Sequence, residues 1–478
     1  MPKFSGSRPP AVAGRFYPGD PGKLRTEVDG MLDAAPDPVP DDNAVGGVSP
    51  HAGYAFSGRL AARVCKALKH KRPKTIVLLG TAHHEEVGGL ALPDTASFAT
   101  PLGEVPVDTG MAEALLAAHP EVKISPAAHA REHSLEVQLP FLQRAHEGAH
   151  ILPLLTGVKN RGSAEELGRE LGRLIKERDA LLIVATDLSH FPSDSGARRS
   201  DLALLAALEK MDADFLWDAD RALMRLDIPQ LHCTACGLGA AAVGITACLE
   251  LDAGVCEVLQ YANSYDISGD AERVVGYGAA LFKKGARPDG PFFGLGEQEK
   301  SALLKLARAA LAEYLRTGKE PAPRAFDLPL LNLPGAAFVT WTERSASAER
   351  ELRGCVGTTL RDRTIGNCVA HFAVRSAVSD TRFTPVAAAD LPALHAEVSV
   401  LSPSRPSTAE AVRPGQGVVF ELGRARGLFL PLMWERYPDK EKFMNVLAGS
   451  KAGAREDAWR DPAAKLWTFE AEAFGEEE

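Results

Sequence analysis

The sequence contains no long apolar segment. No run approaches the roughly 20 apolar residues that a membrane-spanning helix needs. The opening MPKFSGSRPPAVAGRFYPGDPG has no apolar core followed by a cleavage site, so no secretory signal is predicted. Basic residues are outnumbered, with 54 lysines and arginines against 63 acidic residues and a formal net charge of -9, which argues against a nucleic-acid-binding surface. We expect a cytoplasmic protein that binds neither nucleic acid nor membrane.

Cysteine is scarce, with seven residues in a chain of 478. So few cysteines in so long a chain do not indicate a disulfide framework, and most are expected to be small buried hydrophobic residues. Histidine is unevenly distributed, because of 13 residues all but His371 and His395 precede residue 285. This asymmetry indicates that the two halves of the chain perform different chemistry.

A stretch rich in glycine, proline and charge marks the clearest domain boundary. It reads KKGARPDGPFFGLGEQE, covers residues 283–299 and separates a strand-like segment from a helix. We place the break near Pro288. The sequence thus predicts an N-terminal domain at residues 1–285, a linker at 286–296 and a C-terminal domain at 297–478.

Short apolar runs alternate with helical patterns in the first domain. The runs cover residues 44–48, 75–79, 151–154, 181–185 and 257–262, and helices are expected at 57–70 and 163–178, the latter with Ser163 as its N-cap. This alternation predicts an α/β domain with a largely parallel or mixed sheet. The second domain has strand-like pieces at 337–341, 352–358, 396–401, 417–422 and 427–430, a helix at 299–317 and one further helix at 365–378. That mixture predicts an α+β fold.

Three segments that contain histidine directly follow predicted strands. They are SPHAGYAFSG with His51, LLGTAHHEE with His83 and His84, and IVATDLSHF with Asp187 and His190. Ligands bind at the carboxyl ends of the strands in sheets of this kind, so these side chains are expected on one rim of one sheet. A single loop histidine is more often a surface residue, but the shared position of the three segments favours a metal site.

A cysteine in a later segment suits the same site. LHCTACGLGAAAVGITACLE reads as a turn followed by a helix of small residues. Cys236 would lie near the helix N-terminus, where the dipole and the free N–H groups favour the thiolate that a metal ligand needs. The alternative is that Cys233 and Cys236 are buried packing residues, since a single C-x-x-C pair is a weak signal for structural zinc.

Two further segments contain side chains that suit a pocket. REHSLEVQLPFLQ supplies Glu132, His133 and Glu136. Its two glutamates would share one face of a helix and could orient metal-bound histidines, although a solvated helix face explains them equally well. ELRGCVGTTL in the second domain contains Arg353 and Cys355 beside glycines that indicate close backbone approach. A tight bend with a buried cysteine also explains that segment.

The first half resembles the Memo family. The resemblance is carried by RPPAVAGRFYPGD, SPHAGYAFSG, LGTAHH, REHSLEVQLPF, ATDLSHF, TACG and GYGAAL, across about residues 8–283. It implies a fold like that of class III extradiol dioxygenases (LigB-like) and a metal held by His51 of PHAGY, His83 of the HH pair and Cys236 of TACG. It also implies that Asp187 and His190 of DLSH line the same pocket.

The second half resembles the AMMECR family. The matching segments are LRGCVGT, which includes Arg353 and Cys355, then AVRSAVSDTRFTPV, LPALHAEVSVLSP and GLFLPL, across about residues 297–475. Proteins similar to the two halves form the AmmeMemoRadiSam system, together with a radical-SAM protein. The chain therefore resembles a fusion of two members, and the resemblance implies a radical-SAM protein as the partner.

Three functions fit these residues. The first is a metal-dependent oxidoreductase acting on a small molecule or a protein, with one divalent ion (iron before copper) at His51, His83 and Cys236, and with Asp187 and His190 handling protons. His84, Glu132 and His133 would lie around that pocket. Extradiol dioxygenases use a carboxylate where this chain has Cys236, which argues against ring cleavage. The second function is a metal-bound interaction module without turnover, and the third is a zinc metallohydrolase.

Overall fold

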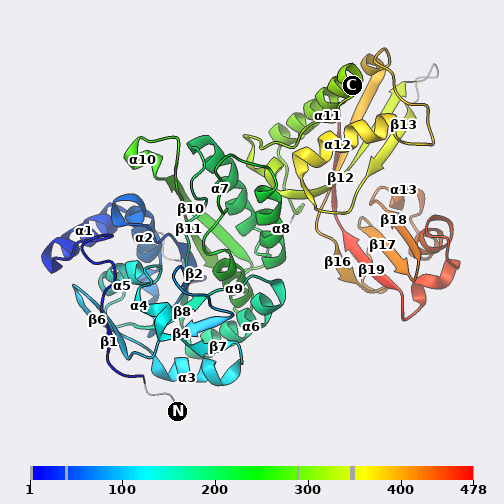
Figure 1. Cartoon of the computed structure of the whole chain (residues 1–478). Coiled ribbons are helices and arrows are strands. Elements are labelled where there is room, and N and C mark those ends of the chain that lie inside the picture. Colours follow the sequence, from blue (N-terminus) through cyan, green and yellow to red (C-terminus); the bar gives the residue numbers. More distant parts are fainter. Residues whose placement is uncertain (1–3, 38–40, 288–289, 345–349, 477–478) are drawn as a thin grey trace. The chain divides into compact units, whose positions relative to one another are not determined.

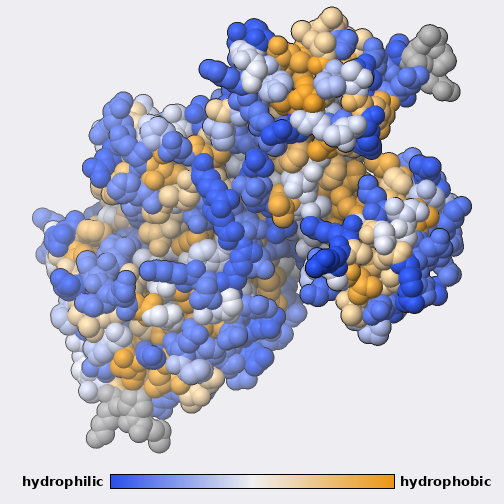
Figure 2. Space-filling view, turned by 45° about the vertical axis from the view of Figure 1, so that its right-hand side comes forward, coloured by the Kyte–Doolittle hydropathy of each residue, from blue (hydrophilic) through white to orange (hydrophobic). Residues whose placement is uncertain are grey.

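The computed structural model describes residues 4–37, 41–287, 290–344 and 350–476. The chain divides into two compact units, Met1–Pro288 and Asp289–Glu478. Hydrophilic residues cover much of the face of each unit that Figure 2 shows. Within the described ranges, no helix is both long enough and apolar enough to cross a membrane.

A mixed sheet forms the centre of the N-terminal unit (Figure 1), and the described residues contribute eight strands to it. In spatial order these are β10 (Val255–Asn263), β11 (Gly276–Lys283), β2 (Ala44–Ser49), β9 (Leu181–Ala185), β3 (Thr75–Thr81), β8 (His150–Thr156), β4 (Leu90–Leu92) and β7 (Val122–Ile124). β2, β9, β3 and β8 are parallel, whereas β11 and β4 run antiparallel to their neighbours β2 and β8. Each of the five predicted apolar runs forms one of these strands, so the α/β prediction is confirmed.

Helices cover both faces of this sheet (Figure 1). One face carries α1 (Pro21–Ala34), α2 (Tyr54–Leu68) and α5 (Leu139–Ala145), and the other carries α6 (Arg161–Arg178), α7 (Asp194–Leu208), α8 (Ala213–Met224) and α9 (Leu238–Leu249). On β3, Ile76 and Leu78 belong to the core under α1, α2 and α5, while Val77 and Leu79 are also fully buried. A strand that is covered on both faces needs apolar residues at every position, which is why the central strands appear in the sequence as continuous apolar runs.

The helix α6 begins earlier than the sequence pattern indicates. Its N-cap is Asn160, whose side-chain oxygen accepts the backbone N–H of Ser163 at 2.9 Å. The prediction of Ser163 as the cap is therefore wrong. Asparagine and serine are equally good caps, and here the asparagine comes first in the chain and takes the role.

The other elements of this unit are short. A small sheet contains β1 (Ser7–Arg8), β5 (Ser97–Thr100) and β6 (Gly103–Pro106), and the connections contain α3 (Thr109–Ala118), α4 (Pro126–Ala130), α10 (Tyr265–Ser268) and the 3-10 turns η1 (Lys69–Lys71) and η2 (Glu136–Gln138).

The C-terminal unit contains two sheets among its described residues. The first has β13 (Arg350–Gly357), β12 (Pro334–Arg344), β15 (Leu394–Leu401) and β20 (Ala471–Gly475), with β14 (Arg363–Thr364) paired to β12, and α11 (Glu297–Thr317) and α12 (Ile365–Val378) pack on it. The second has β16 (Arg405–Ser407), β19 (Lys465–Phe469), β17 (Gly417–Leu422) and β18 (Ala425–Phe429), packed with α13 (Met433–Arg436) and α14 (Lys440–Val446). These antiparallel sheets with helices form an α+β arrangement. The sequence pattern did not predict the helices α13 and α14.

Part of the segment predicted as a linker packs within the C-terminal unit. The backbone N–H groups of Phe293, Gly294 and Leu295 all donate to the carboxylate of Glu472, at 2.8 to 3.1 Å. Phe293 and Leu295 are buried. These residues therefore have a fixed place in the fold.

Candidate metal centre

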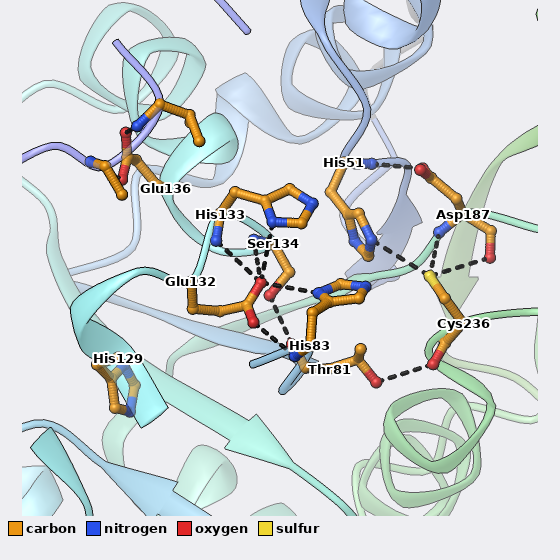
Figure 3. A network of polar contacts seen from close by, with 12 residues as sticks. His51, Thr81, His83, His129, Glu132, His133, Ser134, Glu136, Asp187 and Cys236 are labelled. Atoms are coloured by element: carbon orange, nitrogen blue, oxygen red, sulfur yellow. Dashed lines mark hydrogen bonds and ion pairs between the residues drawn. The ribbon is translucent and has the colours of Figure 1, made fainter. Parts of the chain in front are cut away.

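The candidate site lies at the carboxyl ends of three neighbouring parallel strands. β2, β9 and β3 are adjacent in the sheet, and the segments that follow them contain His51, Asp187 and His83 respectively. Cys236 comes from another direction, one residue before Gly237, the N-cap of α9. Figure 3 shows the rings of His51 and His83 and the sulfur of Cys236 turned toward one another. The fold therefore brings together side chains that are up to 185 residues apart.

Two glycines allow these loops to approach one another. A Cβ at Gly237 would lie 2.7 Å from the Cβ of Thr186, so glycine is needed where the start of α9 meets the end of β9. A Cβ at Gly80 would lie 2.6 Å from Leu135 Cδ2. The two close approaches set the positions of Cys236 and His83.

His51, His83 and Cys236 form a compact set of possible ligands. One nitrogen or sulfur atom of each lies within 4.8 Å of the others, so the three could hold a metal ion. The nearest pair is His51 Nε2 and Cys236 Sγ, at 3.2 Å. His51 is 1% exposed, whereas the His83 side chain is 27% exposed. The set is therefore buried on the His51 side and open on the His83 side.

The sulfur of Cys236 is held by the chain around Asp187. Sγ accepts the backbone N–H of Asp187 at 3.3 Å, and the Cys236 carbonyl accepts the Thr81 hydroxyl at 2.9 Å. Burial, with the nearby Asp187 carboxyl, raises the pKa of the Cys236 thiol well above its usual range. In the metal-free protein this thiol therefore keeps its proton, and a metal ion that binds there must displace it.

Glu132 fixes the orientation of His83. Its Oε2 accepts the backbone N–H of His83 at 2.6 Å, and its Oε1 lies 2.9 Å from ring atom Nδ1. A carboxylate can only accept, so Nδ1 carries the proton and Nε2 presents its lone pair. Burial alone would raise the pKa of Glu132, but the hydrogen bonds from His83 and Ser134 hold it well below its usual range. The carboxylate therefore stays ionised and positions the ring.

Glu132 and Glu136 do not share a helix face, so that prediction is wrong. Residues 131–135 form a turn, and Glu136 opens the short 3-10 turn η2. The solvated-face alternative is also wrong, because Glu132 is 3% exposed and Glu136 is 0% exposed. Ser134 and Leu135 pack against the end of β3, and this tertiary contact replaces the expected helix with a turn.

Glu136 binds the N-terminal segment, which sequence reasoning left out of the site. Its carboxylate accepts from the guanidinium of Arg8, the backbone N–H groups of Ala11 and Val12, and the hydroxyl of Tyr17. The Arg8 guanidinium also donates to the carbonyl of Glu132. Arg8 thus supports the turn that carries the His83 partner. The sequence signal for this contact is the segment RPPAVAGRFYPGD, which contains Arg8 and Tyr17 and matches the Memo family.

Asp187 supports the loop of His51. Its Oδ1 accepts the backbone N–H of His51 at 2.7 Å. Burial raises the pKa of Asp187 to about 7. This carboxyl lies beside the ligand set, and its burial favours the protonated form.

His190 contacts Cys233. Its Nδ1 lies 2.9 Å from the Leu188 carbonyl and 3.6 Å from Cys233 Sγ. Burial lowers the pKa of His190 below its usual value. No hydrogen bond to His190 Nε2 occurs among the described residues, so this atom is available to another group.

His133 lies close to the ligand set, and His84 is more distant. The His133 ring stacks on the His83 ring with centroids 4.7 Å apart, and it lies edge-on to His51 at 5.5 Å. His83, Glu132 and His133 make a second group that could hold a metal ion. His84 is exposed, with its ring 6.4 Å from that of His133.

Arg353 and Cys355 lie in the C-terminal unit, on β13. Arg353 pairs with Glu343. Cys355 Sγ accepts the Thr340 hydroxyl at 3.2 Å, and the backbone of Cys355 donates to Asp380 and accepts from Arg382. Cys355 is only partly buried, so it differs from the fully buried cysteine that a simple bend would give.

Comparisons with known proteins match both units. A family model described as Memo-like protein matches residues 8–281, and one described as AMMECR1 matches residues 304–474. A MEMO1 family protein from Aquifex aeolicus is 36% identical over 276 residues, which is 58% of this chain and 98% of the relative. One from Archaeoglobus fulgidus is 35% identical over 283 residues, or 58% and 99%. A solved structure of an uncharacterised protein from Pyrococcus horikoshii aligns with 37% of this chain and 90% of its own length, at 34% identity and a TM-score of 0.34.

Proposed function

Because the chain belongs to the Memo family over residues 8–281 and carries an AMMECR1 domain over residues 304–474, we propose that its N-terminal unit is a metal-dependent oxidoreductase. One divalent transition-metal ion would be held by His51, His83 and Cys236. The observation that carries the proposal is the convergence of one nitrogen or sulfur atom from each residue within 4.8 Å, at the sheet edge where parallel sheets bind ligands.

The donor atoms suit such an ion. Glu132 leaves His83 Nε2 with a free lone pair, and His51 Nε2 faces the Cys236 sulfur. Two imidazoles and a thiolate are ligands for iron, copper and zinc, and a set of three protein ligands leaves room for water or substrate. The open His83 side gives a substrate access to the ion.

Iron is the proposed metal because the Memo family resembles class III extradiol dioxygenases. When bound, such an ion supplies a centre for electron transfer and a Lewis acid. Ring cleavage is not proposed, because Cys236 stands where those enzymes have a carboxylate.

The chain's own residues would handle protons and orientation. Asp187 has a pKa of about 7 and can hold or release a proton beside His51. His190 offers Nε2 for proton transfer, while its Nδ1 stays bonded to the Leu188 carbonyl. Glu132 keeps His83 in one tautomer.

A redox titration tests the proposed function. The full chain, loaded anaerobically with Fe(II), should show a reversible one-electron change that is lost in Cys236→Ser. Tight binding of zinc in place of iron, with no redox response, would favour a zinc metallohydrolase, for which the cysteine and histidine donors are also suitable. X-ray absorption that finds a fourth protein ligand would favour an interaction module without turnover.

We also propose a radical-SAM protein as the partner, supported by the presence of both domains in one chain. Purification of the tagged full chain from cells that contain such a protein tests this. Recovery of that protein supports the proposal, and its absence from the eluate contradicts it.

A further inference from the structure

A cavity of about 810 Å³ lies at the opposite end of the sheet from the metal centre. Two segments line it, residues 66–74, which run from the end of α2 to the start of β3, and residues 144–149, which connect α5 to β8. β3 and β8 are parallel and begin side by side, with Thr75 paired to His150. The cavity therefore lies at the amino ends of the strands whose carboxyl edge carries the metal centre. We call it the basic cavity.

Positive charge is concentrated around the basic cavity. The segment KALKHKRPK, residues 66–74, contains five lysines and arginines. Lys66 is paired with Asp37, and Arg144 in the opposite wall is paired with Asp29. Lys69, Arg72 and Lys74 form no ion pair with any residue of the described ranges, and Glu147 is the one carboxylate in the lining. The chain as a whole has a net charge of -9. The three unpaired cations therefore make the lining of this cavity positive on a protein that is negative overall.

A buried histidine in the lining makes no hydrogen bond of normal geometry with the described residues. His146 is 6% exposed and lines the basic cavity. Both of its ring nitrogens are buried, and neither makes a hydrogen bond of normal geometry within the described part of the chain, although the backbone of Cys65 is a polar neighbour of the ring. A buried polar group without a good hydrogen bond destabilises the folded chain. An acceptor oxygen of a ligand in the cavity would supply a partner once the ring turns toward it.

The helix dipole alone does not explain this arrangement. Basic side chains in the last turn of a helix interact favourably with its carboxyl end, which accounts for Lys66 and Lys69. Arg72 and Lys74 lie beyond the helix, and His146 belongs to a different segment. All of them line the same hollow.

We propose that the basic cavity binds a small molecule that carries a polyphosphate group. Lys69, Arg72 and Lys74 would neutralise its charges, with the guanidinium fork of Arg72 suited to phosphate oxygens, and His146 would donate an N–H from the wall. The volume lies within the range of about 300–1,000 Å³ that is usual for small-molecule sites. The negative net charge of the chain disfavours a nucleic acid as the ligand. This proposal is independent of the metal centre.

Calorimetry with inorganic tripolyphosphate tests the proposal. The full chain at about 0.15 M salt should bind it saturably with a dissociation constant below about 1 mM, and citrate of the same concentration should bind at least about tenfold more weakly. The triple variant Lys69→Gln/Arg72→Gln/Lys74→Gln should weaken tripolyphosphate binding about tenfold or more. His146→Asn should weaken it several-fold without changing net charge.

A matched control separates a site from general attraction. Lys123→Gln/Arg221→Gln/Lys319→Gln removes the same charge from exposed positions outside the cavity lining and should leave the affinity unchanged. An equal loss in this control, equal binding of citrate, or no saturable binding would overturn the proposal. Metal content, measured in the same samples, should not change, so failure here is distinguishable from failure of the metal centre.

Discussion

The carboxylate of Glu132 binds His83 at two points, through the backbone N–H at 2.6 Å and through ring atom Nδ1 at 2.9 Å. The same carboxylate accepts the backbone N–H groups of His133 and Ser134 at 2.9 Å. One buried anion thus joins the loop after β3 to the 131–135 turn. The position of the His83 ring is therefore a property of the contact between two loops.

The substitution Glu132→Gln should weaken metal binding by about 10–100-fold, which is typical for the loss of a partner that orients a ligand. The amide keeps one acceptor oxygen and loses the charge that fixes the His83 tautomer. Competition with a chelator of known affinity measures the effect. Glu85→Gln is the matched control, because Glu85 is exposed in the loop that contains His83. Equal affinities of the two variants would contradict the role given to Glu132.

Replacement of Arg8 by Met should reduce the free energy of unfolding of the N-terminal unit by about 3–5 kcal/mol. The change leaves the Glu136 carboxylate buried without its cation, and broken buried ion pairs cost about this much. Arg169→Met removes an exposed pair with Glu165 and should cost less than about 1 kcal/mol. Urea unfolding followed by circular dichroism measures both. Similar urea midpoints for the two variants would show that the pair of Arg8 with Glu136 does not stabilise the N-terminal unit.

Stability should depend on pH through Asp201, which is fully buried and accepts the Ser189 N–H and the Tyr261 hydroxyl. Burial raises the pKa of Asp201 to about 7, from an ordinary value of 3.8. Between those values the folded protein keeps a proton that the unfolded chain releases, so this contribution is complete below pH 4 and is lost as the pH rises through 7. The loss is on the order of a few kcal/mol.

Comparison with Asp201→Asn isolates this contribution, because Asp187 also has a raised pKa and titrates in both proteins. The unfolding free energy of the wild type minus that of the variant should fall as the pH rises from about 4 to 7 and should be flat above that range. A difference that is flat with pH would show that Asp201 does not titrate in this range.

Thiol reagents should distinguish the cysteines of the C-terminal unit. Cys355 is partly exposed, whereas Cys368 is fully buried. Brief treatment of the native protein with iodoacetamide, followed by peptide mass spectrometry, should find Cys355 modified and Cys368 unmodified. Modification of both to the same extent would mean that α12 opens in the native protein.

Local pattern was enough to predict the elements that build the site. The runs that became β2, β3 and β9 are apolar throughout because helices cover both faces of the sheet, and the helix predicted at 365–378 is α12 with the same bounds. Strands, polar loops and helices can be predicted from the pattern of residues that are close together in the sequence. The same local pattern also placed His51, His83 and Asp187 at strand ends.

Contacts between distant segments could not be read in this way. The helix predicted through Glu132 and Glu136 is a turn, since Ser134 and Leu135 pack against the end of β3. The ion pair of Arg8 with Glu136 joins residues 128 positions apart. Neither periodicity nor composition contains such a pairing, so the polar network behind the ligand set was missed.

Metal content tests the central claim most directly. The untagged full chain, purified without oxygen and analysed by mass spectrometry of its metals, should contain about one transition-metal ion per chain. His51→Ala and Cys236→Ala should each lose that ion, and His84→Ala, which changes an exposed neighbour, should keep it. An intact protein that binds no metal after anaerobic reconstitution, or variants that keep a full complement, would contradict the account.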